Sequence, residues 1–150
     1  MINALKNEFD RNLKVVYKLL RDIDTTNNIQ LDRLCNELFG SKFYGVFPSD
    51  KIPKLNFHKK YCILNLDKSY QPGSHWVACV LDSNDDIYVF DTYDRIIRKI
   101  LPSIYKLKNH RILSGNRSVL EKKSGTDCGQ RCIAWLLLVE KYGINIAKKI

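Results

Sequence analysis

Three residues of the chain have types and positions that suit nucleophilic catalysis: Cys128, His75 and Asp91. Cys128 stands where a polar run, residues 124–129, meets an apolar segment that is expected to form a buried helix. The free amide N–H groups and partial positive charge of a helix N-terminus stabilise a thiolate and can bind the oxyanion of a tetrahedral intermediate. Gly129 would leave room for a substrate backbone beside the sulfur. Cys128 is therefore the candidate nucleophile.

His75 and Asp91 could supply the general base and the group that orients it. His75 opens a predicted strand, and Asp91 follows another predicted strand sixteen residues later. If the two strands are adjacent and antiparallel, the start of one lies beside the end of the other. The Asp91 carboxylate could then accept a hydrogen bond from the imidazole, as in a nucleophile–base–orienter triad.

Each of these residues also has an ordinary structural explanation. A histidine beside a tryptophan is commonly a packed, hydrogen-bonded residue, an acid after a strand commonly caps the next turn, and a cysteine at a helix start can simply be buried. Cys128 and Cys132, four residues apart on one helix face, could also form half of a zinc site with His75. Zinc is disfavoured because the other histidines, His58 and His110, lack ligand spacing.

The first third of the chain is predicted to hold two helices. Apolar residues spaced three and four apart indicate an amphipathic helix over residues 2–23. Asn27 and Gln30 form a capping pair for a second helix that continues through Leu38 and ends at Gly40. The next segment, residues 43–55, contains two prolines and is predicted to be an ordered loop.

A meander of strands and a buried helix are predicted to follow. Apolar runs between turn residues indicate strands at residues 61–66, 75–81 and 87–90 and a short one at 111–113. Residues 95–107 resemble a helix interrupted near Pro102, and residues 128–142 are apolar nearly all round, as in a central helix. The pattern predicts an α+β fold with one domain over residues 1–150.

Composition narrows the function classes. The chain is 45% hydrophobic and 27% charged, which excludes collagen-like and intrinsically disordered proteins. The longest apolar run, residues 132–139, is too short to span a bilayer. Five cysteines without a Cys-x-x-Cys pair favour a reducing compartment. We expect a soluble, intracellular, globular protein.

The net charge of +9 is concentrated in the last third of the chain. Residues 95–150 contain 13 Lys and Arg against 3 Asp and Glu, whereas the preceding residues are nearly neutral. Such asymmetry suits a polyanionic partner such as nucleic acid. A well-solvated, lysine-rich surface explains it equally well, because no nucleic-acid-binding motif accompanies the charge.

Several segments, taken together, resemble the adenovirus-type (adenain-like) cysteine proteases. This family is the viral branch of the clan that includes the SUMO-deconjugating Ulp enzymes, and it occurs in virophages and related virus-like elements. The resemblance covers most of the chain and includes an aromatic-Gly-Val segment followed by Asp50, a Gly-x-His-Trp motif around His75, an aromatic-acid-x-aromatic segment around Asp91, and Cys-Gly-x-x-Cys from Cys128. The strand at residues 61–66 resembles the one that precedes the catalytic hairpin.

The resemblance implies an adenain/Ulp-like fold, with a central mixed sheet and a buried helix that carries the nucleophile. It implies a cysteine endopeptidase that cleaves viral capsid or core precursor proteins during virion maturation, with Cys128 as nucleophile, His75 as base and Asp91 as orienting acid. It also implies action in the virion and the host-cell cytoplasm or viral factory, as a monomer, with no membrane partner and no required cofactor or metal. Adenovirus relatives are stimulated by DNA, and the basic C-terminal third makes non-specific DNA binding an expectation here.

One departure from the family pattern concerns the oxyanion hole. The family usually has a Gln six or seven residues before the nucleophile, and Lys122 and Glu121 stand at these positions here. Lys122 could donate a hydrogen bond, Glu121 could do so only if protonated, and Gln130 lies after the nucleophile. No oxyanion side chain is assigned from the sequence.

Two other functions stay open at this point. An isopeptidase acting on SUMO- or ubiquitin-like modifiers would use the same catalytic groups, although 150 residues leave little surface for a folded modifier. A basic nucleic-acid-binding module on a catalytically weak protease fold would account for the missing Gln and for the charge asymmetry.

Overall fold

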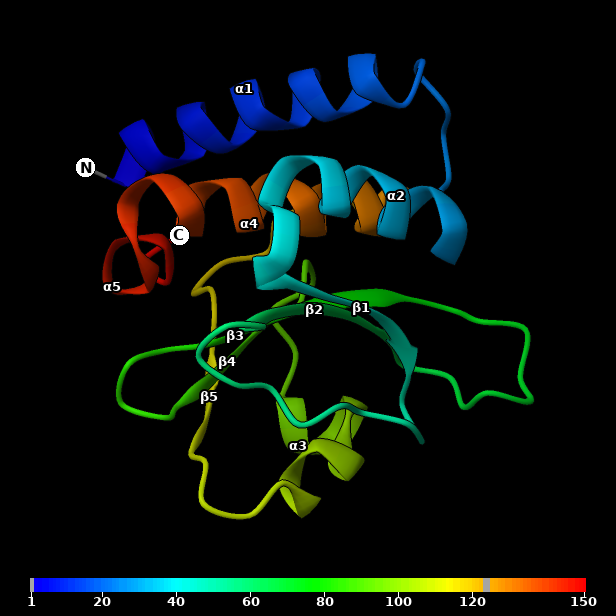
Figure 1. The fold of residues 1–150 in the computed structure, drawn as a ribbon. Helices are drawn as coiled ribbons and strands as arrows, with labels where there is room; N and C mark the ends of the chain where they lie inside the picture. The colour runs from blue at the N-terminus through cyan, green and yellow to red at the C-terminus, as the bar shows by residue number, and fades with distance from the viewer. Residues whose placement is uncertain (1, 123–124) are drawn as a thin grey trace.

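A single five-stranded sheet lies between two layers of helices (Figure 1). The computed structural model describes residues 2–122 and 125–150. The strand order follows the chain: β1 (Phe43–Pro48), β2 (Tyr61–Asn65), β3 (Trp76–Leu81), β4 (Ile87–Phe90) and β5 (Ile112–Ser114). The β2–β3–β4 core is an antiparallel meander, whereas β1 and β5 pair in parallel with their neighbours. The chain is α+β, as the sequence predicts.

The larger helical layer covers one face of the sheet. It contains α1 (Ile2–Leu19), α2 (Asn28–Phe39), α4 (Cys128–Tyr142) and α5 (Ile144–Ala147). In this layer α4 lies between α1 and the sheet (Figure 1). The other face carries α3 (Ile97–Ile100) and the 3₁₀ helix η2 (Pro102–Lys106); a second 3₁₀ turn, η1 (Gly40–Lys42), joins α2 to β1.

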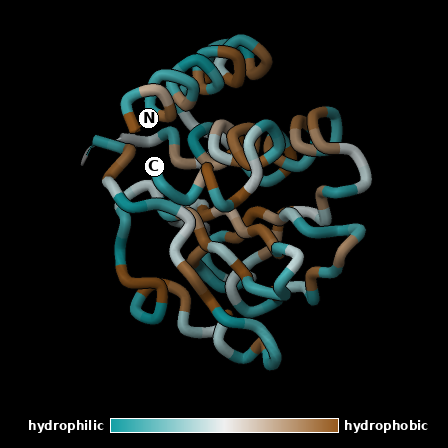
Figure 2. The backbone as a smooth tube through the Cα atoms, turned by 90° about the vertical axis from the view of Figure 1, so that its left-hand side faces the viewer, coloured by the Kyte–Doolittle hydropathy of each residue, from teal (hydrophilic) through white to brown (hydrophobic). Residues whose placement is uncertain are grey.

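Alternation along the strands gives each face of the sheet its own hydrophobic core. Tyr61 and Ile63 of β2 point toward the larger helical layer, and Cys62 and Leu64 point toward the opposite face. All five residues of β2 are buried, as expected for a strand covered on both sides. Figure 2 shows that hydrophilic and hydrophobic residues also alternate along α1, which is an amphipathic helix.

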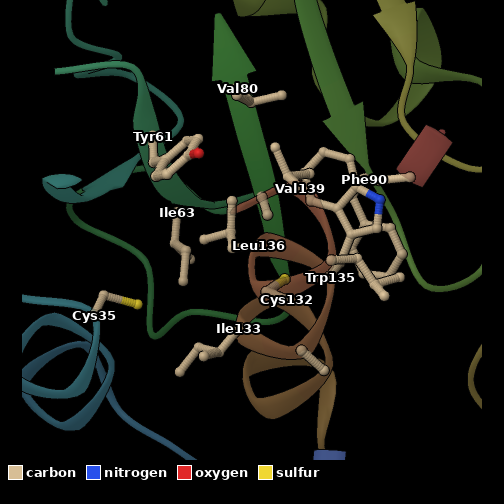
Figure 3. Packing of buried hydrophobic residues seen from close by; sticks show 14 of the residues in the cluster. Cys35, Tyr61, Ile63, Val80, Phe90, Cys132, Ile133, Trp135, Leu136 and Val139 are labelled. Atoms are coloured by element: carbon tan, nitrogen blue, oxygen red, sulfur yellow. The ribbon is translucent and has the colours of Figure 1, made fainter. Parts of the chain in front are cut away.

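The helix α4 is the centre of the larger core. The fully buried Trp135 stacks on Phe90 of β4 with ring centroids 5.1 Å apart, and its indole N–H donates to the carbonyl of Gly115 at 3.0 Å. Ile133 and Leu136 of the same helix belong to this core too, and Ile133 points away from Trp135 on the other side of α4 (Figure 3). This packing fixes α4 against the sheet, and therefore fixes the position of its first residue, Cys128.

Two expectations about the first half of the chain are wrong. Residues 43–48 form the edge strand β1 and not a loop, because parallel pairing with β2 satisfies their backbone and buries Phe43. The first helix ends at Leu19 and not near residue 23, because Arg21 and Asp22 adopt positive φ angles of 56° and 58°. An α-helix cannot continue through left-handed residues.

Other boundaries match the sequence-based expectation closely. The Asn27 side chain accepts from the Gln30 N–H, and the Gln30 side chain accepts from the Asn27 N–H, each at 2.9 Å, so the predicted capping pair is confirmed. The α4 helix has the predicted bounds and ends before Gly143. None of the described helices is both long and apolar enough to cross a membrane.

Candidate active site

The β3–β4 hairpin brings His75 and Asp91 together. Ala78 pairs with Phe90 in this antiparallel hairpin, so the residue just before β3 lies close to the residue just after β4. His75 Nε2 lies 2.9 Å from Asp91 Oδ1. Because a carboxylate can only accept, the Nε2–H group donates, and Nδ1 is left for another partner. The predicted contact between the two side chains is confirmed.

Asp91 is held from three further directions. The Arg95 guanidinium donates from Nε to Oδ2 at 2.9 Å and from the terminal nitrogen to Oδ1 at 3.1 Å. The Arg95 backbone N–H donates to Oδ2 at 3.0 Å, and the Asn116 amide donates to the Asp91 carbonyl at 2.7 Å. The carboxylate is almost fully buried, and these contacts fix its orientation.

Cys128 lies beside this pair, in the first turn of α4. Its sulfur accepts the backbone N–H of Trp76 at 3.5 Å and lies within 4.8 Å of the His75 ring nitrogen. One turn along the helix, the Cys132 thiol donates to the Trp76 carbonyl at 3.4 Å. The backbone of Trp76 therefore joins the start of β3 to the first two turns of α4, which brings the imidazole and the sulfur together.

The electrostatics of the site favour a charged imidazolium. Burial alone lowers the pKa of His75, but its hydrogen bond to Asp91 and its interaction with the nearby Cys128 side chain raise that pKa from 6.5 to about 9. Burial raises the pKa of Asp91, yet hydrogen bonds from His75 and Arg95 outweigh burial and hold that pKa well below its ordinary value. Near neutral pH the site therefore favours an imidazolium at His75 beside the Asp91 carboxylate.

Two more side chains, Tyr93 and Glu121, lie close to the triad. The Tyr93 ring stacks on the His75 ring with centroids 5.3 Å apart, and the Arg95 guanidinium lies 5.1 Å from the Tyr93 ring centre. The buried Glu121 carboxylate accepts from the Thr92 hydroxyl at 2.6 Å and from the Tyr93 hydroxyl at 3.3 Å. These contacts hold the Glu121 carboxylate within 4.8 Å of the ligand atoms of His75 and Cys128.

The triad opens onto a hollow of about 550 Å³. Its lining includes Cys128, His75, Tyr93, Arg95 and Gly73, the last of which has a positive φ of 92°. Another hollow of similar size, about 580 Å³, lies between the segment after β1 and η2, and none of the three triad residues lines it. The chemistry therefore points to the first hollow as the candidate substrate site.

The candidate substrate site continues as a groove toward the free edge of the sheet. A smaller hollow of about 350 Å³ shares Gly73 and Trp76 with the hollow beside Cys128 and reaches Val46 and Phe47 of β1. A further hollow of about 500 Å³ continues from these β1 residues to Tyr44. Through these shared residues the three hollows follow one another from the Cys128 sulfur to the edge strand.

Gly129 has a different role from the predicted one. A Cβ atom on Gly129 would lie 2.1 Å from Thr26 Oγ1 and 3.0 Å from a methyl group of Leu31. The absent side chain therefore lets α4 pack against the segment between α1 and α2, and Gly129 does not line the hollow beside Cys128. The expectation that it admits a substrate backbone is wrong.

The remaining candidates differ in their exposure to solvent. Lys122 is exposed, whereas Gln130 is fully buried and donates to the carbonyls of Ile23 and Asp24 at 3.0 and 3.2 Å. Cys132 is buried in the core beside the sheet (Figure 3). Ser124, in the predicted polar run, lies outside the described residues.

The structure adds positioning residues that the sequence alone did not indicate. Arg95 follows Asp91 by four residues, an acid–base spacing that could have indicated their ion pair. Asn116 carried no such signal, because it approaches Asp91 from 25 residues away along the chain. Tyr93 belongs to the aromatic-acid-x-aromatic motif, and the structure shows it stacked on the imidazole.

Comparison with known proteins gives no independent indication of function. No protein-family model matches the chain, and no curated protein matches it. The functional proposal below therefore rests on the geometry of these residues and on the motifs they belong to.

Proposed function

We propose that the chain is a cysteine endopeptidase with Cys128 as nucleophile, His75 as general base and acid, and Asp91 as the group that orients the imidazole. One observation carries this proposal: His75 donates a hydrogen bond to Asp91 on one side and lies within 4.8 Å of the Cys128 sulfur on the other, at the wall of an open hollow. A buried structural histidine has no need of a thiol on one side and a fixed carboxylate on the other.

The first half of the reaction forms a thioester. His75 Nδ1 takes the proton of the Cys128 thiol, and the sulfur attacks the carbonyl carbon of the scissile peptide bond. The carbonyl oxygen becomes an oxyanion next to the first turn of α4, where unpaired amide N–H groups can stabilise it. Asp127, the N-cap residue, leaves those amides free, because its carboxylate instead binds Tyr17 and Arg131 at 2.7 and 2.8 Å.

The second half releases both products. The His75 imidazolium gives its proton to the leaving nitrogen, the C–N bond breaks, and the amine product departs. His75 then takes a proton from a water molecule, whose oxygen attacks the thioester carbon. The C–S bond breaks and the carboxylic acid product leaves. The proton on His75 then passes to the Cys128 sulfur, which restores the starting state.

The groove supports an extended peptide as substrate. It runs from Cys128 past Gly73 and Trp76 to the free edge of β1, and an extended chain can bind such an edge with its backbone. We propose that the hollow beside Gly73 takes small residues next to the cleaved bond, the preference of the adenain-like relatives. We propose the capsid or core precursor proteins of a virus or virus-like element as the physiological substrates.

The adenain/Ulp-like fold is part of the same proposal. The mixed sheet, the hairpin that carries His75 and Asp91, and the buried helix that begins at Cys128 are compatible with it. The chain order of these residues supports it as well. We infer a virion-maturation protease that acts in the virion and in the host-cell cytoplasm or viral factory.

A proteome-derived peptide library tests the activity without assuming any cleavage sequence. The library is digested with the wild-type chain and with Cys128→Ala, and new termini are identified by mass spectrometry. We expect a shared sequence preference around the cleavage sites of the wild type and no new termini with Cys128→Ala. Cys35→Ala, which removes a buried thiol of α2 that does not line the hollow, is the matched control and should retain cleavage.

The outcomes also separate the alternatives. Absence of cleavage by the wild type, or equal cleavage by Cys128→Ala, would contradict the proposal. Hydrolysis of a SUMO- or ubiquitin-fluorophore conjugate as fast as a peptide would favour the isopeptidase. Tight DNA binding without any hydrolysis would favour the inert nucleic-acid-binding module.

A further inference from the structure

The candidate active site contains three different metal-binding side chains. Within residues 2–122 and 125–150, the ligand atoms of His75, Glu121 and Cys128 lie within 4.8 Å of one another. They come from three separate parts of the chain: the residue before β3, the segment before α4 and the first turn of α4. An imidazole nitrogen, a carboxylate oxygen and a thiolate sulfur are all ligands that zinc accepts.

The surroundings of these three groups match those of metal ligands. His75 donates its Nε2–H to Asp91 at 2.9 Å, and metal-binding histidines usually donate the other ring N–H to a carboxylate in this way. The Glu121 carboxylate is likewise held by the hydroxyls of Thr92 and Tyr93. The ligand groups are therefore oriented before any metal arrives.

The charge and the geometry also suit a divalent cation. A thiolate, a carboxylate and a neutral imidazole carry two negative charges, which balance Zn²⁺. Zinc bonds of about 2.0–2.3 Å place tetrahedral ligand atoms roughly 3.3–3.8 Å apart, so side-chain rotations of about 1 Å would close the site. Because Cys128 and His75 line the hollow, a fourth position would face it. Magnesium and calcium are disfavoured, because they prefer oxygen ligands.

We propose that His75, Glu121 and Cys128 form a zinc-binding site that blocks the nucleophile reversibly. The metal takes the sulfur, the imidazole nitrogen and a carboxylate oxygen as ligands, and the protons that these groups carried pass to solvent. The site differs from the disfavoured arrangement with Cys132, whose buried thiol donates to Trp76 and does not belong to this group. Metal binding stands independently of the peptidase, whereas its inhibitory effect rests on the proposed function.

A Co²⁺ titration of the full chain tests the binding. Cobalt substitutes for zinc and gives visible bands in tetrahedral sites and a thiolate charge-transfer band in the near ultraviolet. We expect both band types, saturation at one Co²⁺ per chain, and loss of the bands when Zn²⁺ is added. Cys128→Ala should remove the charge-transfer band.

Two carboxylate variants make the test specific. Glu121→Gln keeps the size and polar contacts of the side chain but removes the ligand charge, and we expect the affinity for Zn²⁺ to fall at least tenfold. Glu140→Gln is the matched control, because this α4 carboxylate binds Lys42 and Tyr61 away from the site. The inference is overturned if no charge-transfer band forms or if Glu121→Gln binds Zn²⁺ as tightly as the wild type.

A peptide assay with and without zinc separates this inference from the proposed function. Peptide cleavage that zinc abolishes and a chelator restores supports both. Metal binding without peptide cleavage in metal-free solution contradicts the proposed function but leaves the metal site standing. Peptide cleavage that zinc does not inhibit overturns the inhibitory role.

Discussion

Asp91 is shared by two cations, the imidazole ring of His75 and the guanidinium of Arg95. The carboxylate stays ionised because both partners stabilise its charge. The imidazolium is stabilised in turn, so the folded pKa of His75 lies above its ordinary value. The stability that the charged His75 contributes to the fold is fully present below about pH 6.5 and is lost as pH rises through about 9.

The His75 pKa can be measured directly by NMR titration of its ring protons. We expect a value of about 9 in the wild type, and a clear fall toward 6.5 in Asp91→Asn, because the amide carries no charge to stabilise the imidazolium. Arg95→Gln is the matched control, since it keeps the carboxylate and should leave the pKa well above 6.5. An unchanged pKa in Asp91→Asn would contradict the assigned cause.

Glu121 offers a second test at the level of one residue. A carboxylate near Cys128 disfavours negative charge on the reacting oxygen, whereas an amide could donate a hydrogen bond to it. We expect Glu121→Gln to raise kcat/KM for a peptide substrate by about tenfold or more in metal-free buffer. A rate equal to or below that of the wild type would show that the carboxylate does not oppose the reaction.

The sequence indicated the triad because each member has a distinctive chemical type at the end of an element. It could not indicate Asn116 as a positioning residue, since its contact with Asp91 depends on how the segment after β5 folds back. The sequence marked Glu121 only as one of the two residues at the positions where the resembled family has a Gln. Its proximity to the sulfur follows from contacts with Thr92 and Tyr93, which are tertiary.

The N-terminal end of α4 is the element that sets the position of the sulfur. It packs against the segment between α1 and α2, where Gly129 approaches Thr26 too closely for any side chain. Trp76 joins the same region, since its indole N–H donates to the Thr26 carbonyl at 3.4 Å. Cys128 is therefore held by packing on two sides.

Gly129→Ala should lower the free energy of unfolding by about 1–3 kcal/mol, because the added methyl group collides with Thr26 Oγ1. Thermal or urea unfolding measures the change. In the double variant with Thr26→Ala, part of the loss should be recovered, because the colliding oxygen is gone. Strict additivity of the two substitutions would contradict this packing explanation.

Elements with a strong local pattern were predictable, and the edge strand was not. The Asn27–Gln30 capping pair and the apolar run of α4 contain their own signals. The strand β1 contains Gly45 with a φ of 151° and ends at Pro48, which are typical of loops. It becomes a strand only through parallel pairing with β2, a partner that local sequence does not identify.

At the scale of the whole molecule, the sheet separates two cores and leaves the candidate substrate site at one edge. The net positive charge is carried by residues 95–150, the part of the chain that includes Cys128. We propose non-specific DNA binding through this third of the chain. Phosphate contacts of this kind release counterions and weaken with salt.

Fluorescence anisotropy with double-stranded DNA tests this charge effect. For two to four phosphate contacts, affinity should fall about 10- to 100-fold between ~50 and ~200 mM salt. Lys106→Glu with Lys108→Glu should weaken binding more than Lys6→Glu with Lys14→Glu, although all four side chains are exposed and the charge change is equal. Equal effects of the two pairs would assign binding to net charge alone.

The rate at which iodoacetamide alkylates Cys128 tests the central claim most directly, because it reports whether His75 activates the sulfur. At pH ~6.5 an ordinary cysteine is only about 1% thiolate. The account predicts rapid labelling of Cys128 in the wild type and a rate at least about tenfold lower in His75→Gln, measured by mass spectrometry. The buried thiols of Cys35 and Cys132, whose pKa values are raised by burial, should stay unlabelled in both. Equal rates at Cys128 in the two proteins would contradict the account.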